Sequence, residues 1–171
     1  MCFVPGSGQI WNVRLNDTAD LTTNCLVDVI FVVDESGSVG NDNYELVKSF
    51  LSDFVAKLDI ESGNTRVGLV PYSTDVDTAE AFNLNAYSSV TDVQDAINSL
   101  TWTVWYARTY TNEALEYVRT TMLTSAAGDR PDVPNVVVVL TDGQSTDTSL
   151  TEVCIVYKLI YMYFLLSETI S

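Results

Sequence analysis

The sequence predicts an α/β protein with a doubly wound, mostly parallel β-sheet covered by helices on both faces. Two apolar runs, 27–33 and 135–140, are rich in β-branched residues and lack polar alternation, which is typical of strands buried on both faces. Segments whose apolar residues recur with helical spacing lie between the predicted strands. Strands that alternate with helices favour right-handed β-α-β units and therefore a parallel sheet.

The first predicted helix follows the first strand and a short polar loop. Asp42, with Glu45 three residues later, fits an N-terminal capping pattern. The apolar side chains after it recur with the spacing of one helical face: Leu46, Val47, Phe50, Leu51, Phe54, Val55 and Leu58. This pattern predicts an amphipathic helix packed on the sheet.

The remaining elements follow in order. Residues 66–73 predict a second strand, with Pro71 weakening its middle, and residues 78–84 predict a short third strand. Residues 90–100 and 112–123 have apolar residues at helical spacing. The last predicted strand is the apolar run at 135–140.

Charge and composition exclude several classes of function. The 171 residues suit one domain, and 8 basic against 23 acidic side chains give a net charge of −15. Such a surface repels phosphate backbones and anionic lipid, so nucleic acid and membrane headgroups are poor partners, whereas divalent cations and basic protein patches suit it. The chain contains no histidine, which excludes histidine-based catalytic triads and histidine-ligated zinc.

The termini differ in composition from the middle of the chain. Residues 1–24 are polar and predict an N-terminal extension, and no signal peptide is visible in them. We expect the domain over 25–150 and an atypical apolar segment over 151–171. Its apolar run, 154–166, is shorter than the about 20 residues that a membrane span needs. A buried strand or helix, a membrane-associated tail and a non-native terminus are the alternatives for it.

Three cysteines, Cys2, Cys25 and Cys154, form no C-x-x-C pair, so neither a zinc knuckle nor a thioredoxin-type motif is present. Their odd number fits reduced thiols or one disulfide with a leftover thiol. Asn16 begins a glycosylation sequon, which matters only in a secreted chain.

Polar residues follow both of the strongly buried strands. In doubly wound sheets ligands bind beyond the carboxyl ends of the strands, at the switch point. If the two strands are neighbours, Asp34 and Asp142 face one crevice, and Ser36 and Ser38 converge on the same point from a tight loop. Carboxylates with hydroxyls describe a site for Mg²⁺ or Ca²⁺. The alternative is that both fragments are ordinary turns.

These residues carry a resemblance to a known family. Residues 27–40, VDVIFVVDESGSVG, resemble the opening of a von Willebrand factor type A (VWA) domain, including the D-x-S-x-S part of its metal-ion-dependent adhesion site (MIDAS). Residues 66–73 resemble the second strand of the family, and 138–143 its fourth strand with the turn that carries the last metal residue. The resemblance covers about 25–150 and implies the Rossmann-like VWA fold.

The resemblance also implies a ligand set. Ser36 and Ser38 would bind the metal through their hydroxyls, and Asp34 and Asp142 would act directly or through water. The middle element of the family is a threonine in a glycine-rich loop, for which Thr109 is the better match.

Two features depart from the family pattern. One is the loop that carries the metal threonine, where residues 105–108 replace the usual glycines. Thr111 is the second choice for that threonine. Four aromatic residues are expected either in the core or on the rim of the metal site: Trp102, Trp105, Tyr106 and Tyr110. Residues 144–171 are too few for the last strands and helices of the family, so either the run at 154–166 replaces the fifth strand or the chain is a fragment or a divergent gene model.

The resemblance implies a metal-dependent adhesion or matrix-binding module like those of matrilin, collagen VI and integrins. The metal would be Mg²⁺, or Mn²⁺ or Ca²⁺. An acidic side chain of an extracellular partner, such as collagen or another matrix protein, would complete its coordination shell. We expect an extracellular protein that is not an enzyme and that neither binds nucleic acid nor spans a membrane. The alternatives are a truncated member without a working site, acting as a scaffold or arising from an imperfect gene model, and a metal-dependent hydrolase.

Overall fold

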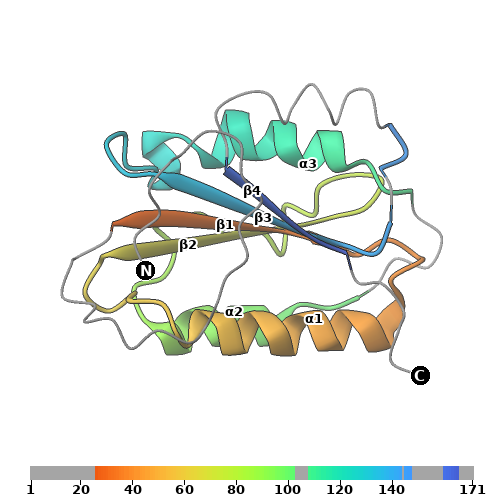
Figure 1. Ribbon diagram of the computed structural model, residues 1–171, viewed down its shortest axis with the longest axis horizontal. Coiled ribbons are helices and arrows are strands. Elements are labelled where there is room, and N and C mark those ends of the chain that lie inside the picture. The colour runs from red at the N-terminus through yellow and green to blue at the C-terminus, as the bar shows by residue number, and fades with distance from the viewer. Residues whose placement is uncertain (1–25, 103–107, 144, 148–159, 166–171) are drawn as a thin grey trace.

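The computed structural model describes residues 26–102, 108–143, 145–147 and 160–165, and it places helices on the two sides of a set of strands (Figure 1). The elements in chain order are β1 (Val27–Asp34), α1 (Gly40–Val55), β2 (Thr65–Tyr72), α2 (Val90–Ser99), α3 (Thr111–Tyr117), the π-helical turn η1 (Val118–Met122), the 3₁₀ turn η2 (Ser125–Ala127), β3 (Asn135–Thr141) and β4 (Ile160–Leu165).

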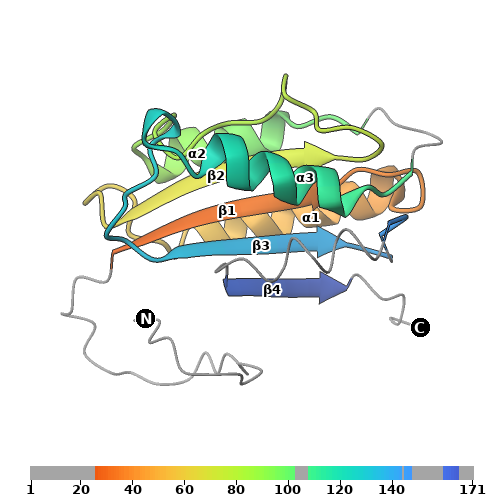
Figure 2. The same cartoon turned by 90° about the horizontal axis from the view of Figure 1, so that it is seen from above.

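The described strands form one parallel sheet in the order β2-β1-β3-β4 (Figure 2). Helices α1 and α2 cover one face and α3 covers the other (Figure 1). This three-layer arrangement confirms the predicted fold class. Because β1 lies between β2 and β3, the strands that end at Asp34 and at Thr141 are direct neighbours, as the site prediction requires.

The core consists of two apolar clusters, one on each face of the sheet. Successive side chains of a strand point to opposite faces, so Phe31 and Val33 join the cluster under α1 and α2, whereas Ile30 and Val32 join the cluster under α3. All of these side chains are almost fully buried. Burial on both faces explains why the strand sequence shows no polar alternation.

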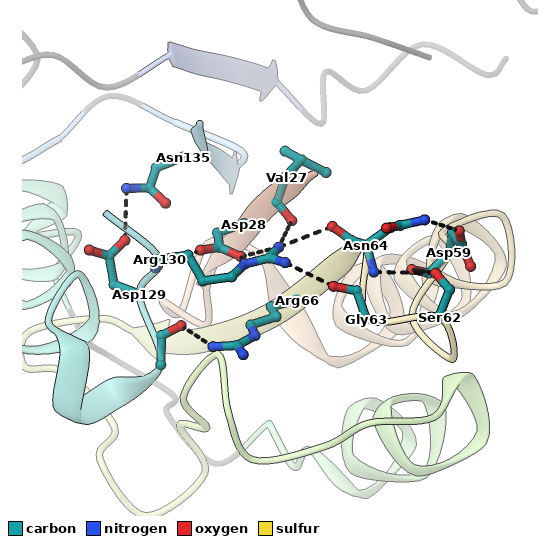
Figure 3. Close-up of polar contacts among 11 residues, drawn as sticks. Val27, Asp28, Asp59, Ser62, Gly63, Asn64, Arg66, Asp129, Arg130 and Asn135 are labelled. Atoms are coloured by element: carbon teal, nitrogen blue, oxygen red, sulfur yellow. Dashed lines mark hydrogen bonds and ion pairs between the residues drawn. The ribbon is translucent and has the colours of Figure 1, made fainter. Parts of the chain in front are cut away.

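An ion pair stabilises the amino end of the sheet, which is the end away from the predicted site (Figure 3). The guanidinium of Arg130 donates to Oδ1 of Asp28 from Nε at 2.9 Å and from Nη2 at 2.7 Å. It also donates to the carbonyls of Val27, Gly63 and Asn64 at 2.8–3.0 Å. Asp28 is fully buried, so this arginine both neutralises it and ties the start of β1 to the loop before β2.

Two expectations for α1 are wrong. The helix begins at Gly40 after Val39, and no side-chain hydrogen bond caps it, so Asp42 lies inside the first turn and is not the cap. Leu46 and Phe50, expected on the buried face, are 65% and 40% exposed. The buried face instead runs through Tyr44, Val47, Lys48, Leu51 and Val55.

The segment predicted as a third strand is also different. Residues 78–84 form no named strand, and only Phe82 makes an isolated bridge, with Leu69 of β2. The chain turns there because Oδ1 of Asp77 accepts hydrogen bonds from the backbone N–H groups of Ala79 and Glu80. The helix predicted over 112–123 is present, but its second half has π geometry, with the Leu123 N–H bonding to the Val118 carbonyl.

Part of the predicted apolar C-terminal segment is a strand. β4 lies beside β3, with Val136 paired to Ile160 and Thr141 to Leu165, so β3 is not the edge strand of the described sheet. This arrangement favours the expectation that the apolar run supplies a strand of the sheet. Among the described helices, none is long and apolar enough to cross a bilayer. The cysteines, the Asn16 sequon, Trp105 and Tyr106 lie outside the described residues.

Candidate metal centre

The candidate site lies where β1 and β3 end side by side. Asp34 is the last residue of β1, and the loop that follows carries Ser36 and Ser38 before α1 begins at Gly40. Asp142 comes directly after Thr141, the last residue of β3. Parallel pairing places both strand ends at the same edge of the sheet.

A chain of hydrogen bonds joins three of the predicted ligands. The hydroxyl oxygens of Ser36 and Ser38 lie 3.2 Å apart, and the Ser38 hydroxyl donates to Oδ1 of Asp142 at 3.1 Å. Ser36 is fully buried and Ser38 is exposed, so the chain runs from the sheet edge to the surface. The structure therefore brings together groups that lie more than one hundred positions apart in sequence.

Asp34 lies beneath this chain and is fixed through both carboxylate oxygens. Oδ1 accepts the backbone N–H of Ser36 at 2.8 Å, and Oδ2 accepts the hydroxyl of Thr141 at 2.5 Å. The residue is 1% exposed. Burial raises its pKa, the charge of Asp142 raises it further, and the hydrogen bonds from Thr141 and Ser36 oppose the shift.

The donor set suits a hard divalent cation. Two carboxylates and two hydroxyls are oxygen ligands of the kind that Mg²⁺, Mn²⁺ and Ca²⁺ prefer. Among the described residues, no lysine or arginine forms an ion pair with Asp34 or Asp142. A positive ion would therefore offset a buried negative charge that these side chains leave uncompensated.

The two candidate threonines occupy different surroundings. Thr111 is 2% exposed, and its hydroxyl lies 3.0 Å from the hydroxyl of Tyr72, which places it in the packing between α3 and β2. Thr109 is half-buried and is held by its backbone: its N–H donates to Oγ1 of Thr146, and its carbonyl accepts the N–H of Thr146 at 2.7 Å. Within the described residues, no hydrogen bond links the Thr109 hydroxyl to the four other predicted ligands.

Of the aromatic residues expected on the rim, Trp102 contacts the site loop. Its indole N–H donates to the carbonyl of Ser36 at 3.4 Å, and its ring packs against the core cluster under α1. Tyr110 lies at the start of α3, and its hydroxyl accepts a hydrogen bond from the Arg108 side chain. Trp102 thus combines the two roles that the sequence left open.

Sequence reasoning missed Thr141. Its hydroxyl reaches across from β3 to Asp34 and also accepts the N–H of Gly143 at 3.2 Å. The signal was present, because Thr141 directly precedes Asp142, but a threonine at the end of a strand has no distinctive spacing. Its role follows from the strand neighbour that it faces.

Comparison with known families and proteins agrees with this geometry. The family model of the von Willebrand factor type A domain matches residues 28–160. The collagen alpha-4(VI) chain of Mus musculus is 40% identical over 122 residues, which cover 70% of this chain and 5% of that protein. Integrin alpha-2 of Bos taurus is 38% identical over 130 residues, which cover 75% of this chain and 10% of that protein.

Matrilin-1 of Gallus gallus is 36% identical over 121 residues, which cover 71% of this chain and 24% of that protein. Among solved structures, proximal thread matrix protein 1 from the mussel byssus superposes with a TM-score of 0.71 at 23% identity, covering 81% of this chain and 37% of that one. This likeness confirms the fold.

The chain spans a quarter or less of the length of these curated relatives. They are matrix and adhesion proteins and not enzymes, which confirms the expectation of a non-enzymatic domain. The matched range contains both strands that end at the site and the loop that carries Ser36 and Ser38. On this evidence the chain belongs to the von Willebrand factor type A domain family.

Proposed function

We propose that this domain binds an extracellular protein partner through a divalent cation held by Asp34, Ser36, Ser38, Thr109 and Asp142. The observation that supports it best is the hydrogen-bonded chain from Ser36 through Ser38 to Asp142, with the buried Asp34 beneath it. These oxygens already lie close together, so a cation replaces hydrogen bonds between them without rearranging the fold.

Each residue has a defined part in this proposal. The hydroxyls of Ser36, Ser38 and Thr109 supply neutral ligands, and the carboxylates of Asp34 and Asp142 supply the negative charge. The bound cation would offer an open coordination position to a carboxylate oxygen of the partner. At a net charge of −15 the domain repels an acidic partner, and one cation reverses the local sign where that carboxylate binds.

The donor chemistry indicates the kind of cation, and the relatives indicate the kind of partner. A structure of the mussel byssus protein is described as having a zinc-occupied MIDAS motif. For this chain we propose Mg²⁺ as the cation, with Mn²⁺ or Ca²⁺ as substitutes, because the donors are all oxygen. The matrix and adhesion relatives favour an extracellular location and a partner such as collagen or another matrix protein.

The cation is tested by thermal unfolding of the full chain in EDTA and then in increasing Mg²⁺ or Mn²⁺. A cation bound only by the folded state stabilises it by about 2.7 kcal/mol at 100 times its dissociation constant. We expect a saturable rise in the melting temperature that Asp142→Ala loses and that Asp95→Ala, a carboxylate exposed on α2, retains. A cooperative transition without any shift would mean a folded domain whose site is broken.

The partner is tested by binding of the same proteins to immobilised fibrillar collagen. We expect binding in Mn²⁺ that EDTA abolishes and that Asp142→Ala abolishes, while Asp95→Ala binds like the wild type. Binding that persists in EDTA, or that Asp142→Ala leaves unchanged, would contradict a cation-mediated contact. A cation-dependent melting shift without collagen binding would keep the metal site and exclude collagen as the partner.

A further inference from the structure

A second group of acidic side chains lies outside the site described above. Carboxylate oxygens of Glu35, Asp77 and Glu80 all lie within 4.8 Å of one another. Glu35 follows β1, whereas Asp77 and Glu80 come from the segment after β2 that was expected to form a strand. The fold therefore gathers three negative charges from two separate parts of the chain.

Neutral donors hold two of these carboxylates in place. Oδ1 of Asp77 accepts the backbone N–H groups of Ala79 and Glu80 at 2.8 and 3.2 Å. Both carboxylate oxygens of Glu80 accept the backbone N–H of Thr101, and Oε1 also accepts its hydroxyl at 2.6 Å. These contacts fix the positions of the carboxylates but bring no positive charge to them.

One carboxylate oxygen of the cluster is buried without a partner. Glu35 is 2% exposed, yet within the described part of the chain its Oε2 makes no hydrogen bond. A buried polar atom without a partner is costly, so it points to a missing ligand.

The buried cation of α1 is engaged elsewhere. Lys48, the buried lysine of α1, donates to Glu45 and to the carbonyl of Leu100. Among the described residues, no ion pair reaches Glu35, Asp77 or Glu80.

We propose that Glu35, Asp77 and Glu80 bind a Ca²⁺ ion at a second site. Ca²⁺ takes 6–8 oxygen ligands at about 2.3–2.6 Å, so two oxygens that bind one ion lie at most about 5.2 Å apart. The carboxylate oxygens of this cluster, all within 4.8 Å of one another, fall inside that limit. Mg²⁺ requires shorter distances and is usually bound by only one or two carboxylates. The two ligand sets share no residue, so this site does not depend on the proposed adhesion function.

Calorimetric titration of the full chain with Ca²⁺ tests the proposal, using Asp142→Ala as the background so that the first site does not contribute. We expect this variant to bind Ca²⁺. Adding Asp77→Asn or Glu80→Gln should weaken that binding by more than the about 10–100-fold that loss of an outer-shell partner costs. Adding Asp75→Asn, which removes an exposed carboxylate of the same loop, should leave it unchanged.

Folding of each variant is checked by its cooperative thermal transition in EDTA. The proposal is overturned if Asp142→Ala binds no Ca²⁺ at millimolar concentration, or if Asp77→Asn and Glu80→Gln both leave the binding unchanged. Stronger binding of Mg²⁺ than of Ca²⁺ would overturn the assignment of the ion. The first site is tested separately, by the part of the melting shift in Mg²⁺ or Mn²⁺ that Asp142→Ala removes. Failure of the Ca²⁺ proposal therefore leaves that test unaffected.

Discussion

The hydroxyl of Thr141 donates a hydrogen bond of 2.5 Å to Oδ2 of Asp34, which joins the carboxyl ends of β3 and β1. Asp34 also accepts the Ser36 N–H through its other oxygen, so both oxygens are fixed before any cation arrives. A buried carboxylate held through both oxygens keeps one orientation. Thr141 is thus a positioning residue for the proposed metal centre and not one of its predicted ligands.

Removing that hydroxyl should weaken cation binding more than it weakens the fold. We expect Thr141→Val to lower Mn²⁺ affinity by about 10–100-fold, as loss of an outer-shell partner does, because Asp34 loses its donor. Thr141→Ser keeps the hydroxyl and should restore most of the affinity. Titration calorimetry with Mn²⁺ measures both variants, and equal affinities for Val and Ser would contradict the positioning role.

At the other end of the sheet, Arg130 should carry much of the stability. Arg130→Ala leaves the fully buried Asp28 without its counter-charge, which costs about 3–5 kcal/mol in comparable buried pairs. Arg130→Lys should recover only part of this, because an ammonium cannot reproduce the fork that reaches Asp28 and the neighbouring carbonyls. Urea unfolding of the variants measures the loss.

Arg119 provides the matched control for that prediction. It pairs with Glu116 one turn away on the surface, and both side chains are nearly half exposed. Exposed pairs of this kind contribute about 0.3–0.5 kcal/mol, so Arg119→Ala should change the free energy of unfolding little. A similar loss for Arg119→Ala and Arg130→Ala would show that the burial of Asp28 is not the cause.

The contribution of Glu35 to the stability of the cation-free protein should fall as the pH rises through the acidic range. Burial raises the pKa of Glu35 from 4.5 to about 7, so the folded state holds its proton more tightly than the unfolded chain does. The resulting stabilisation is complete below pH 4.5 and is lost as the pH rises through about 7. Charging Glu35 then costs on the order of 3 kcal/mol.

Glu35→Gln isolates this contribution. We expect the variant to match the wild type near pH 4.5 and to be more stable than it above about pH 7, in urea unfolding with EDTA. Asp75→Asn, an exposed carboxylate close in sequence to Asp77, controls for the loss of one negative charge. A constant difference between wild type and Glu35→Gln at all pH values would contradict the prediction.

Gly128 should tolerate no side chain. Its φ is +94°, and a Cβ there would lie 2.7 Å from the backbone nitrogen and Cβ of Asn85. Gly128→Ala therefore adds a clash to the about 1–2 kcal/mol of left-handed backbone strain. Gly63→Ala is the control, because its φ is +76° but the space around it is open, so only the strain applies. Equal losses of unfolding free energy would exclude the clash.

The two buried strands and the candidate metal ligands that follow them were predictable because their signals are local. A strand buried on both faces must be apolar throughout, and β1 and β3 show this in Val29–Val33 and in Val136–Leu140. The polar residues that follow them stand out against such runs. The missed features are those where local signals conflict with packing, such as Leu46, which has the right helical spacing and is nevertheless exposed.

By itself, then, the sequence determined the alternation of strands and helices and the family, and it placed Asp34 and Asp142 after two buried strands. Periodicity carries this information because it records which side of an element faces the core. The tertiary structure decided that these two strands are neighbours. Only the tertiary structure decided that Thr141 holds Asp34, that Arg130 neutralises Asp28, and that Asp77 meets Glu35. A polar side chain acquires its role from groups far away along the chain, and periodicity does not encode which groups those are.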